Sequence, residues 1–574
     1  MNIFKIMQSE IDEFQNGSIE ISPGYRYSQS KLVKRIMLYS NGIYPSGKID
    51  KQGNYKFWFD IIQPRVDAEV KNIDFDTKDI VIYSQSIKDS VNNFICNAFL
   101  QDWLYESGQA GRLNDAVEEG SGWGNVVWKQ IKGDYEKVDL KNFYVINQTA
   151  EYLKDSPVIE RRVLNQEELR AKMGVWDNVE KTIKECGNKE FVSMKTGSNI
   201  GQTTTSPYYE IYERNGMVST KVLKESQGKK DGDEDNFVLA KITVAGLNKG
   251  QTDSKYVLFA EEISEMPYIE YHRGRYYGRW FRKGIIETLF DLQTRANEIG
   301  NQIARGLEWS SKSLFKSSDK LIAQNILTDL NNGDIIRSTD LTQVPVRMEG
   351  IDQLLADWNR VLQMADRLCN SYEVVTGESL PSGTPFKLGA LVNQNANKLF
   401  DFIREKLSGS FQQVIEKWIL PSLMKDLKVE DVIKITGDSE YYKPFLEMIV
   451  NSWYYKNLLA FGPHTKEQSE IIKEQKLSEL SKKKDAYLKL VKGWWEGYKP
   501  RAKVMISGEN VNLEKELTND SSFINLEQDP VRRTALIELA MLRTGRDVSM
   551  LPKSMPAQPQ PLPQANAPID KPII

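Results

Sequence analysis

Two stretches near the middle of the chain carry its clearest helical pattern. From position 285, apolar residues recur every three or four positions over about six turns, and a second stripe with this spacing runs from Ile351 to about Tyr372. Such spacing places apolar side chains on one helix face, so it predicts amphipathic helices at 285–311 and 350–372. The first stripe consists of Ile285, Leu289, Leu292, Ala296, Ile299, Ile303 and Leu307.

The sequence before these helices mixes helical and β-type patterns. Helical patterns occupy parts of the first 55 residues and the region around 87–104, and Pro64 interrupts a pattern between them. A further helix is expected to pass into a strand at 126–128. The residues expected to end that helix are Gly120, Gly122 and Gly124.

Residues 142–260 consist of short β-type runs separated by Gly, Asn and Asp clusters. This texture predicts a small, mainly antiparallel sheet within a predominantly helical α+β fold. Asn165 is expected to cap a short helix inside this region. The acidic positions Asp231, Asp233 and Asp235 have calcium-loop spacing but lack the glycine and glutamate of such loops, so they predict a solvated turn.

The segment between the two long helices predicts a strand at 314–315, a helix at 321–330 and a strand at 334–337. A loop rich in Gly, Pro and Ser occupies 373–387. A third long helix is expected from Leu388, with a bend at Gly409 and an end at Pro421.

The remaining sequence reads as helical and charged as far as position 551. The run Lys482–Lys484 is expected on a solvated helix face, and a capped helix is expected at 529–545. Residues 552–574 are rich in Pro, Gln and Ala without a core-forming period, so we expect them to be disordered.

Composition and charge narrow the classes of protein. A chain of 574 residues is expected to form two or more packing units. The 76 Lys and Arg against 79 Asp and Glu argue against a general nucleic-acid coat protein, but not against one that lets DNA slide. No apolar run reaches the roughly 20 residues that span a bilayer, and the N-terminus does not resemble a signal peptide. We therefore expect a soluble protein, with no membrane partner, that stays in its cell.

Candidate chemistry is sparse. The chain has three cysteines in no paired spacing and two histidines, His272 and His464. No phosphate-binding loop, zinc motif or nucleophile motif occurs. The sequence therefore predicts no catalytic residue, no metal site and no cofactor, and His272 is expected to be a polar surface or junction residue.

The segment YHRGRYYGRWFRK, at 271–283, interleaves aromatic and basic residues. In a functional interpretation, its arginines contact a nucleic-acid backbone while its aromatic rings stack on bases. In a structural interpretation, which we favour, the segment is a packed junction that seats the following helix and pairs its arginines with carboxylates. The arginines are Arg273, Arg275, Arg279 and Arg282.

The order of these elements resembles the portal proteins of tailed bacteriophages. Three stretches carry the resemblance: DSPVIERRVLNQEELRAKMGVWDNVEK, GRWFRKGIIETLFDLQTRANEIGNQIARG and NSYEVVTGESLPSGTPFKLGALVNQ. The resemblance covers roughly residues 55 to 550. It implies a portal-like architecture of wing, stem, clip and crown that assembles as a ring.

Residues 1–284 are expected to form an N-terminal arm, whose first 54 residues lie outside the resemblance, and an α+β wing. By the resemblance, 285–311 and 350–372 are the two stem helices, with a clip at 312–349, a tunnel loop at 373–387, a long wing helix and wing completion at 388–460 and a helical crown at 461–551. The tail at 552–574, expected to be disordered from its composition, also lies outside the resemblance.

The resemblance also implies site residues. The tunnel loop would face DNA through weak, sequence-independent contacts, and the clip would face terminase and then adaptor proteins. The arginines of 271–283 would lie at the wing–stem junction. The tunnel-loop residues are Gly377, Ser379, Ser382, Gly383, Thr384 and Lys387, and the clip residues are Lys316, Lys320, Asp334 and Arg337.

Such a protein would form a ring, usually of twelve subunits, at one capsid vertex of the virion after assembly in the host cytoplasm. Its implied partners are double-stranded DNA, major capsid and scaffolding proteins, terminase, and head-completion or tail adaptor proteins. Two alternatives stay open: another head–tail or baseplate component, and a DNA-processing hydrolase.

Overall fold

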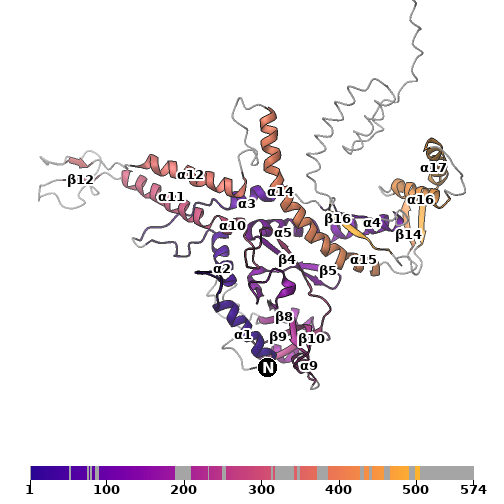
Figure 1. Cartoon of the computed structure of the whole chain (residues 1–574), viewed down its shortest axis with the longest axis horizontal. Helices are drawn as coiled ribbons and strands as arrows, with labels where there is room; N and C mark the ends of the chain where they lie inside the picture. The colour runs from indigo at the N-terminus through magenta and orange to yellow at the C-terminus, as the bar shows by residue number, and fades with distance from the viewer. Residues whose placement is uncertain are drawn as a thin grey trace, which may run out of the picture. The chain divides into compact units, whose positions relative to one another are not determined.

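The computed structural model describes residues 2–50, 53–73, 77, 80–83, 90–187, 208–229, 232–247, 254–311, 314–316, 342–344, 350–371, 386–426, 432–437, 442–457, 466–489 and 498–504. The chain divides into two compact units, Met1–Ile506 and Ser507–Ile574. All described residues belong to the first unit, which mixes helices and strands as the α+β prediction requires (Figure 1).

The N-terminal region contains three helices and a hairpin: α1 (Ile3–Asn16), β1 (Ile19–Ser22), β2 (Tyr25–Tyr27), α2 (Gln29–Ser40) and α3 (Gln63–Ile73). Pro64 does not interrupt a helix, because α3 begins at this point. The Asp60 carboxylate accepts hydrogen bonds from the backbone N–H groups of Ile62 (2.9 Å) and Gln63 (3.1 Å). Proline is tolerated in a first helical turn, where its missing N–H would have no partner.

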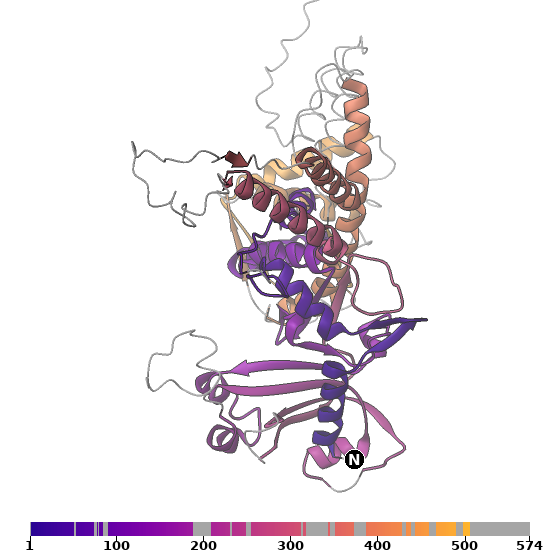
Figure 2. The same cartoon turned by 90° about the vertical axis from the view of Figure 1, so that its left-hand side faces the viewer.

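A five-stranded antiparallel sheet forms in the region where the sequence predicts one. Its order is β10 (Tyr256–Glu262), β9 (Phe237–Ala245), β8 (Tyr209–Ser219), β7 (Val158–Leu164) and β6 (Phe143–Val145). Helix α1 packs on this sheet and buries Met7 and Phe14 against it (Figure 2). The smaller helices of the region are α6 (Gln166–Arg170), α7 (Val179–Glu185), α9 (Thr220–Ser226), and the single turns η3 (Leu140–Asn142) and η4 (Leu153–Asp155).

The predicted cap at Asn165 is confirmed. Its side chain accepts a bond from the Glu168 N–H (2.8 Å), and the Glu168 carboxylate accepts one from the Asn165 N–H (2.8 Å), which is a capping box. Asp233 and Asp235 lie in the exposed turn between α9 and β9, as the solvated-turn interpretation expects, and position 231 lies outside the described residues.

A second sheet of order β11 (Tyr268–His272), β4 (Asn125–Ile131) and β5 (Asp134–Lys137) packs with α4 (Ser90–Glu106) and α5 (Gln109–Trp123). The prediction that Gly120 and Gly122 end α5 is wrong, since the helix continues to Trp123. It ends at Gly124, which has a φ of +90°. A Cβ at this position would also lie 2.6 Å from the Gly284 nitrogen, so only glycine fits.

The two central helices form close to the predicted positions. The first is divided into α10 (Ile285–Thr288) and α11 (Phe290–Ser311), and the second is α12 (Ile351–Cys369). Strand β12 (Leu314–Lys316) confirms the strand predicted at 314–315 and pairs with β13 (Thr342–Val344). The helix predicted at 321–330 and the strand at 334–337 lie outside the described residues.

The third long helix differs from its prediction at both ends. Helix α14 (Phe386–Val414) begins two residues early and includes Gly409, the position of the expected bend. It passes through a π-helical turn, η6 (Ile415–Ile419), into α15 (Leu420–Asp426), which contains Pro421. A π turn displaces the carbonyl that a proline ring would otherwise meet, so the helical path continues past Pro421.

The expectation of a wholly helical region at 461–551 is wrong for its described part. Helix α17 (Lys466–Ser481) is followed by β15 (Asp485–Lys489) and β16 (Arg501–Val504), and Lys482–Lys484 lie in the exposed turn between α17 and β15 instead of on a helix face. Strand β15 pairs with β14 (Val432–Thr436), which precedes α16 (Tyr442–Lys456). Strand β16 pairs with β3 (Ile80–Tyr83). The predicted helix at 529–545 and the tail at 552–574 lie outside the described residues.

Candidate functional site

Helices α11 and α12, called here the helix pair, lie side by side (Figure 1). Their facing sides bury Ile299 of α11 and Val361 and Ala365 of α12. An ion pair between Arg295 and Asp357 (2.7 Å) links the exposed margins of the two helices. The pair is therefore joined by an apolar stripe, as the periodicity predicts.

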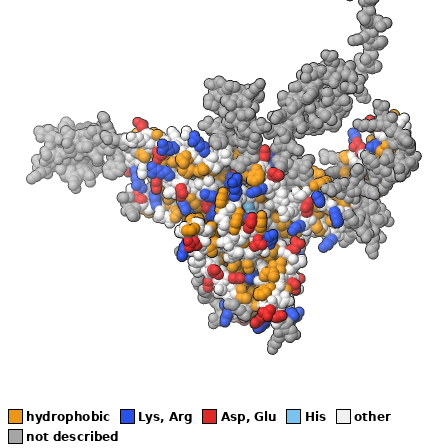
Figure 3. Space-filling model, in the orientation of Figure 1, with side chains coloured by type: hydrophobic (Ala, Val, Ile, Leu, Met, Phe, Trp, Pro, Cys, Tyr) orange, Lys and Arg blue, Asp and Glu red, His pale blue; other side chains and the backbone are white. Residues whose placement is uncertain are grey.

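The apolar surface of α12 is wider than its contact with α11. Leu355, Met364 and Leu368 are 44%, 45% and 52% exposed. At 3.6 residues per turn, Leu355 and Leu368 lie roughly 140° apart around the helix, on opposite flanks of the buried stripe. Figure 3 shows hydrophobic, basic and acidic side chains interspersed over the helix pair. Apolar side chains thus remain exposed on both flanks of α12.

A row of amides on α11 binds an extended segment that precedes α3. The amides are four residues apart, which is about 6 Å along a helix, and they meet every second residue of the segment, which is about 6.6 Å along extended chain. Because the two spacings are nearly equal, the amide side chains of α11 can accept hydrogen bonds from the segment's backbone as a neighbouring strand would. The bonds join Asn301 Oδ1 to Phe57 N (2.8 Å), Asn297 Oδ1 to Phe59 N (2.9 Å) and Gln293 Oε1 to Ile61 N (3.0 Å).

The sequence interpretation did not identify this row. Gln293 and Asn297 are fully buried or nearly so, and Asn301 is 8% exposed. Amides at positions i, i+4 and i+8 beside an apolar stripe were the available signal, because buried amides need hydrogen-bond partners. They fix the register of residues 57–61 on α11.

The close approach of this segment requires a glycine. A Cβ at Gly300 would lie 2.4 Å from Cε2 of the Phe59 ring, which is well inside van der Waals contact. The Phe59 ring in turn packs edge-on against Trp358 of α12, with ring centroids 5.6 Å apart. Phe59 therefore contacts both members of the helix pair.

The segment 271–283 seats the base of the helix pair through buried ion pairs. Arg273 makes two bonds of 2.6 Å to the carboxylate of Glu69 on α3, whose side chain is 1% exposed. Arg279 pairs with Glu287 of α10 (2.7 Å). These contacts match the packed-junction interpretation, because the guanidinium groups of Arg273 and Arg279 bind carboxylates within the fold.

Arg275 and Arg282 differ from the other two arginines because they face a cavity of about 630 Å³ shared with Lys406 of α14. Arg282 is buried and donates to the backbone carbonyls of Arg279 (2.9 Å) and Glu151 (3.0 Å). Burial, together with the positive charges of Arg282 and Arg275, lowers the pKa of Lys406. The junction thus contains a small cationic cavity.

His272 is a junction residue, as the sequence predicts. Its Nδ1 lies 2.7 Å from Asn125 Oδ1 and its Nε2 lies 2.9 Å from Glu270 Oε2. The indole of Trp280 donates to the same Glu270 oxygen (2.6 Å). Both ring nitrogens are therefore engaged by neighbours within the fold.

A group of buried charges between the two sheets was not predicted. Lys129 lies 2.6 Å from Glu160 and 2.9 Å from Glu213, and all three side chains are at most 7% exposed. Burial raises the pKa of Glu160. At Glu213, the attraction of the positive charges of Lys129 and Lys241 outweighs the effect of burial and lowers the pKa to about 2.

Within the described ranges, no group of three or more His, Cys, Asp or Glu side chains could hold a metal ion.

Two of the residues predicted for the tunnel loop and clip lie in described elements. Lys316 lies in β12, and Lys387 lies in the first turn of α14, so it belongs to a helix and not to the loop. The remaining positions lie outside the described residues: Gly377, Ser379, Ser382, Gly383, Thr384, Lys320, Asp334 and Arg337.

No known protein family model matches this chain, and no curated protein sequence is significantly similar to it. Among the helices of the described ranges, none combines the length and apolar character needed to cross a membrane.

Proposed function

We propose that this chain is the subunit of a phage portal, a non-enzymatic ring at one capsid vertex through which double-stranded DNA enters and leaves. The observation that carries the proposal is the helix pair, with exposed apolar side chains on both flanks of α12. In a closed ring each copy has two neighbours, so each helix pair would bury two flanks. Leu355 would face one neighbour, and Met364 and Leu368 would face the other.

The base of the helix pair supports this role. Buried ion pairs at Arg273 and Arg279 and the amide row of α11 attach the pair to the body through several elements. Such attachment suits a stem that keeps its position relative to the body while DNA moves. The interspersed charges of the helix pair also suit DNA that slides, since each phosphate contact adds salt-dependent affinity.

The proposal assigns the partners that the resemblance implies: capsid and scaffolding proteins, terminase, and later head-completion or tail adaptor proteins. ATP hydrolysis would belong to terminase. The rival role, another head–tail or baseplate component, differs in one respect. A portal is required for DNA packaging, whereas an infection depleted of a baseplate component still fills its capsids.

The test is electron microscopy of the purified protein, with scaffolding protein added, classified by end-on views. We expect a closed ring of about twelve subunits around a hole wide enough for a duplex. The double variant Leu355→Asp, Leu368→Asp is expected to prevent closure, because it places charge in both flanks of the interface. The matched control is Met217→Asp on β8, which is 53% exposed and distant from α12 in the sequence.

Two results would refute the proposal. One is a compact dimer that persists across concentrations with scaffolding protein present. The other is normal DNA packaging in an infection depleted of this protein.

A further inference from the structure

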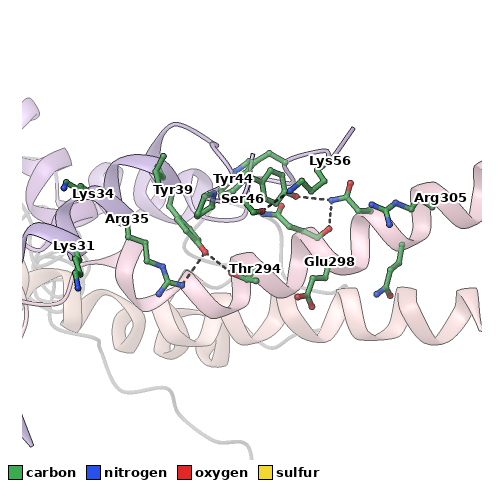
Figure 4. A pocket seen from close by; sticks show the side chains of 16 residues that line it. Lys31, Lys34, Arg35, Tyr39, Tyr44, Ser46, Lys56, Thr294, Glu298 and Arg305 are labelled. Atoms are coloured by element: carbon green, nitrogen blue, oxygen red, sulfur yellow. Dashed lines mark hydrogen bonds between the residues drawn. The ribbon is translucent and has the colours of Figure 1, made fainter. Parts of the chain in front are cut away.

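A pocket of about 850 Å³ lies between α2, residues 44–46 and 56–58, and α11, beside the amide row. Its walls are largely apolar and aromatic and include Leu38, Tyr39, Tyr44 and Trp58. Tyr44 and Trp58 pack edge-on with ring centroids 5.3 Å apart. Figure 4 shows the Tyr39 side chain extending from α2 to Thr294 on α11.

The polar groups of the pocket walls are largely occupied by bonds within the chain. Each tyrosine hydroxyl has a partner, and the amide of Asn301 is used by its own neighbours. The wall therefore offers a mainly apolar surface, in which the indole Nε1 of Trp58 is buried without a hydrogen-bond partner among the described residues. The bonds join Tyr39 Oη to Thr294 Oγ1 (2.9 Å), Tyr44 Oη to the Phe57 carbonyl (2.8 Å), Asn301 Nδ2 to Tyr44 Oη (3.0 Å) and Lys56 Nζ to Ser46 Oγ (3.0 Å).

The rim of the pocket is strongly basic. Five cationic side chains line it against one carboxylate, that of Glu298, which pairs with Arg295 (3.3 Å). Among the described residues, no carboxylate oxygen lies within 4.0 Å of the ammonium groups of Lys31, Lys34 or Lys56. The other two cations, Arg35 and Arg305, pair with Asp291 (3.9 Å) and Asp50.

The cations stand at both ends of the pocket. In Figure 4, Lys31, Lys34 and Arg35 extend from the α2 end, whereas Lys56 and Arg305 lie at the opposite end. An apolar centre between two basic ends is complementary to an extended ligand with a bulky apolar group in the middle and negative charges on either side.

We propose that this pocket binds an acidic peptide segment of a partner protein through one or two bulky apolar side chains flanked by Asp or Glu. A nucleotide fits less well. The edges of a nucleobase carry donors and acceptors that lose water on binding, and the occupied wall offers them few replacements. An aliphatic side chain or a Phe ring has no polar atom that would be left unpaired.

The test measures fluorescence anisotropy of short labelled peptides in which Phe, Leu, Ile, Met, Tyr or Trp is flanked by Asp and Glu. One control set replaces the bulky residue by Ser, and another replaces the acids by Asn and Gln. A labelled oligothymidylate of the same net charge is the nucleic-acid arm. The protein is the full chain, either unchanged or as Lys31→Glu, Lys34→Glu.

We expect salt-dependent binding of the acidic peptides that requires both the bulky residue and the acids. The double charge reversal should weaken it about tenfold or more, because two attractive contacts become repulsive. The matched variant Lys5→Glu, Lys229→Glu makes the same charge change at exposed lysines that do not line the pocket, and it should leave binding unchanged.

Three results would overturn the proposal: no binding by any acidic peptide, equal weakening by the two double variants, or tighter and competing binding of the oligothymidylate. Because the pocket lies within one copy, the assay works on monomers. Its failure is therefore distinguishable from a failure to form rings.

Discussion

The contact between Gly300 and Phe59 yields a prediction whose sign depends on the packing at the helix pair. Gly300→Ala would place a methyl group 2.4 Å from the Phe59 ring. At an open helical site, replacing Gly by Ala stabilises the helix by about 1 kcal/mol. Forcing an extra carbon into a packed site instead costs about 1–3 kcal/mol.

We therefore expect Gly300→Ala to destabilise the binding of residues 57–61 to α11. In a Phe59→Ala background the obstructing ring is absent, and the same substitution should stabilise by about 1 kcal/mol. The difference between a gain of about 1 kcal/mol and a cost of about 1–3 kcal/mol is a coupling energy of about 2–4 kcal/mol across the double-mutant cycle.

Hydrogen exchange suits this measurement better than global unfolding, because a chain of 574 residues does not unfold in one two-state step. The amides of Phe57, Phe59 and Ile61 donate to the row on α11, so their exchange reports local opening. Exchange of these amides should be faster in Gly300→Ala than in the unchanged protein. It should be slower in the double variant than in Phe59→Ala alone.

The matched control is Gly409→Ala in α14, where a new Cβ would meet nothing within 4 Å. It should stabilise its own helix and leave exchange at the three amides unchanged. Slower exchange at these amides in Gly300→Ala alone would refute the reasoning, since it would mean that the Phe59 ring yields without cost.

Three further predictions concern polar groups. Asn297→Leu should lower the free energy of local opening at Phe59 by roughly 1–3 kcal/mol, because it leaves the backbone N–H of Phe59 without its acceptor. The measurement is faster hydrogen exchange of that amide, and unchanged exchange would contradict the prediction. Arg273→Met should lower the free energy of local opening at α3 by about 3–5 kcal/mol, read as faster hydrogen exchange of α3 amides, because it leaves the Glu69 carboxylate buried and unpaired. Arg295→Met, in an exposed pair, should lower the corresponding free energy at α11 by at most about 1 kcal/mol, and equal effects of the two variants would contradict this. Burial raises the pKa of Glu119 from 4.5 to about 7, so the native state binds this proton more tightly. Its contribution to stability is complete below pH 4.5 and is lost as the pH rises through about 7, by up to about 3 kcal/mol. Glu119→Gln should therefore flatten the pH dependence of local opening at α5 between these values, read by hydrogen exchange, and an unchanged slope would contradict it.

The elements that the sequence predicts well are those whose pattern is local. The stripes of α11 and α12, the antiparallel strands and the Asn165 cap each depend on neighbours within a few residues. The packed junction at 271–283 followed from aromatic residues placed directly before a helix.

The failures arise where a distant segment decides the local structure. The π turn before Pro421 packs Ile415 and Ile419 into the core, and this packing outweighs the usual effect of proline. The lysines at 482–484 are compatible with a helix by propensity, but pairing of β15 with β14 ends the helix before them. The pocket beside the amide row combines α2 with α11, and no spacing in one segment predicts that pairing.

The pairing of β3 with β16 has a consequence for synthesis of the chain. On one edge of β3, the Asn97 side chain bonds to both backbone groups of Ile82 (2.6 and 2.8 Å), and the other edge pairs with β16. At about 5–20 residues per second, a ribosome completes β16 roughly 20–80 s after β3. During that interval the second edge is open to pairing with other nascent chains. A chaperone that covers 80–83 until residue 504 emerges would therefore raise the yield of folded protein.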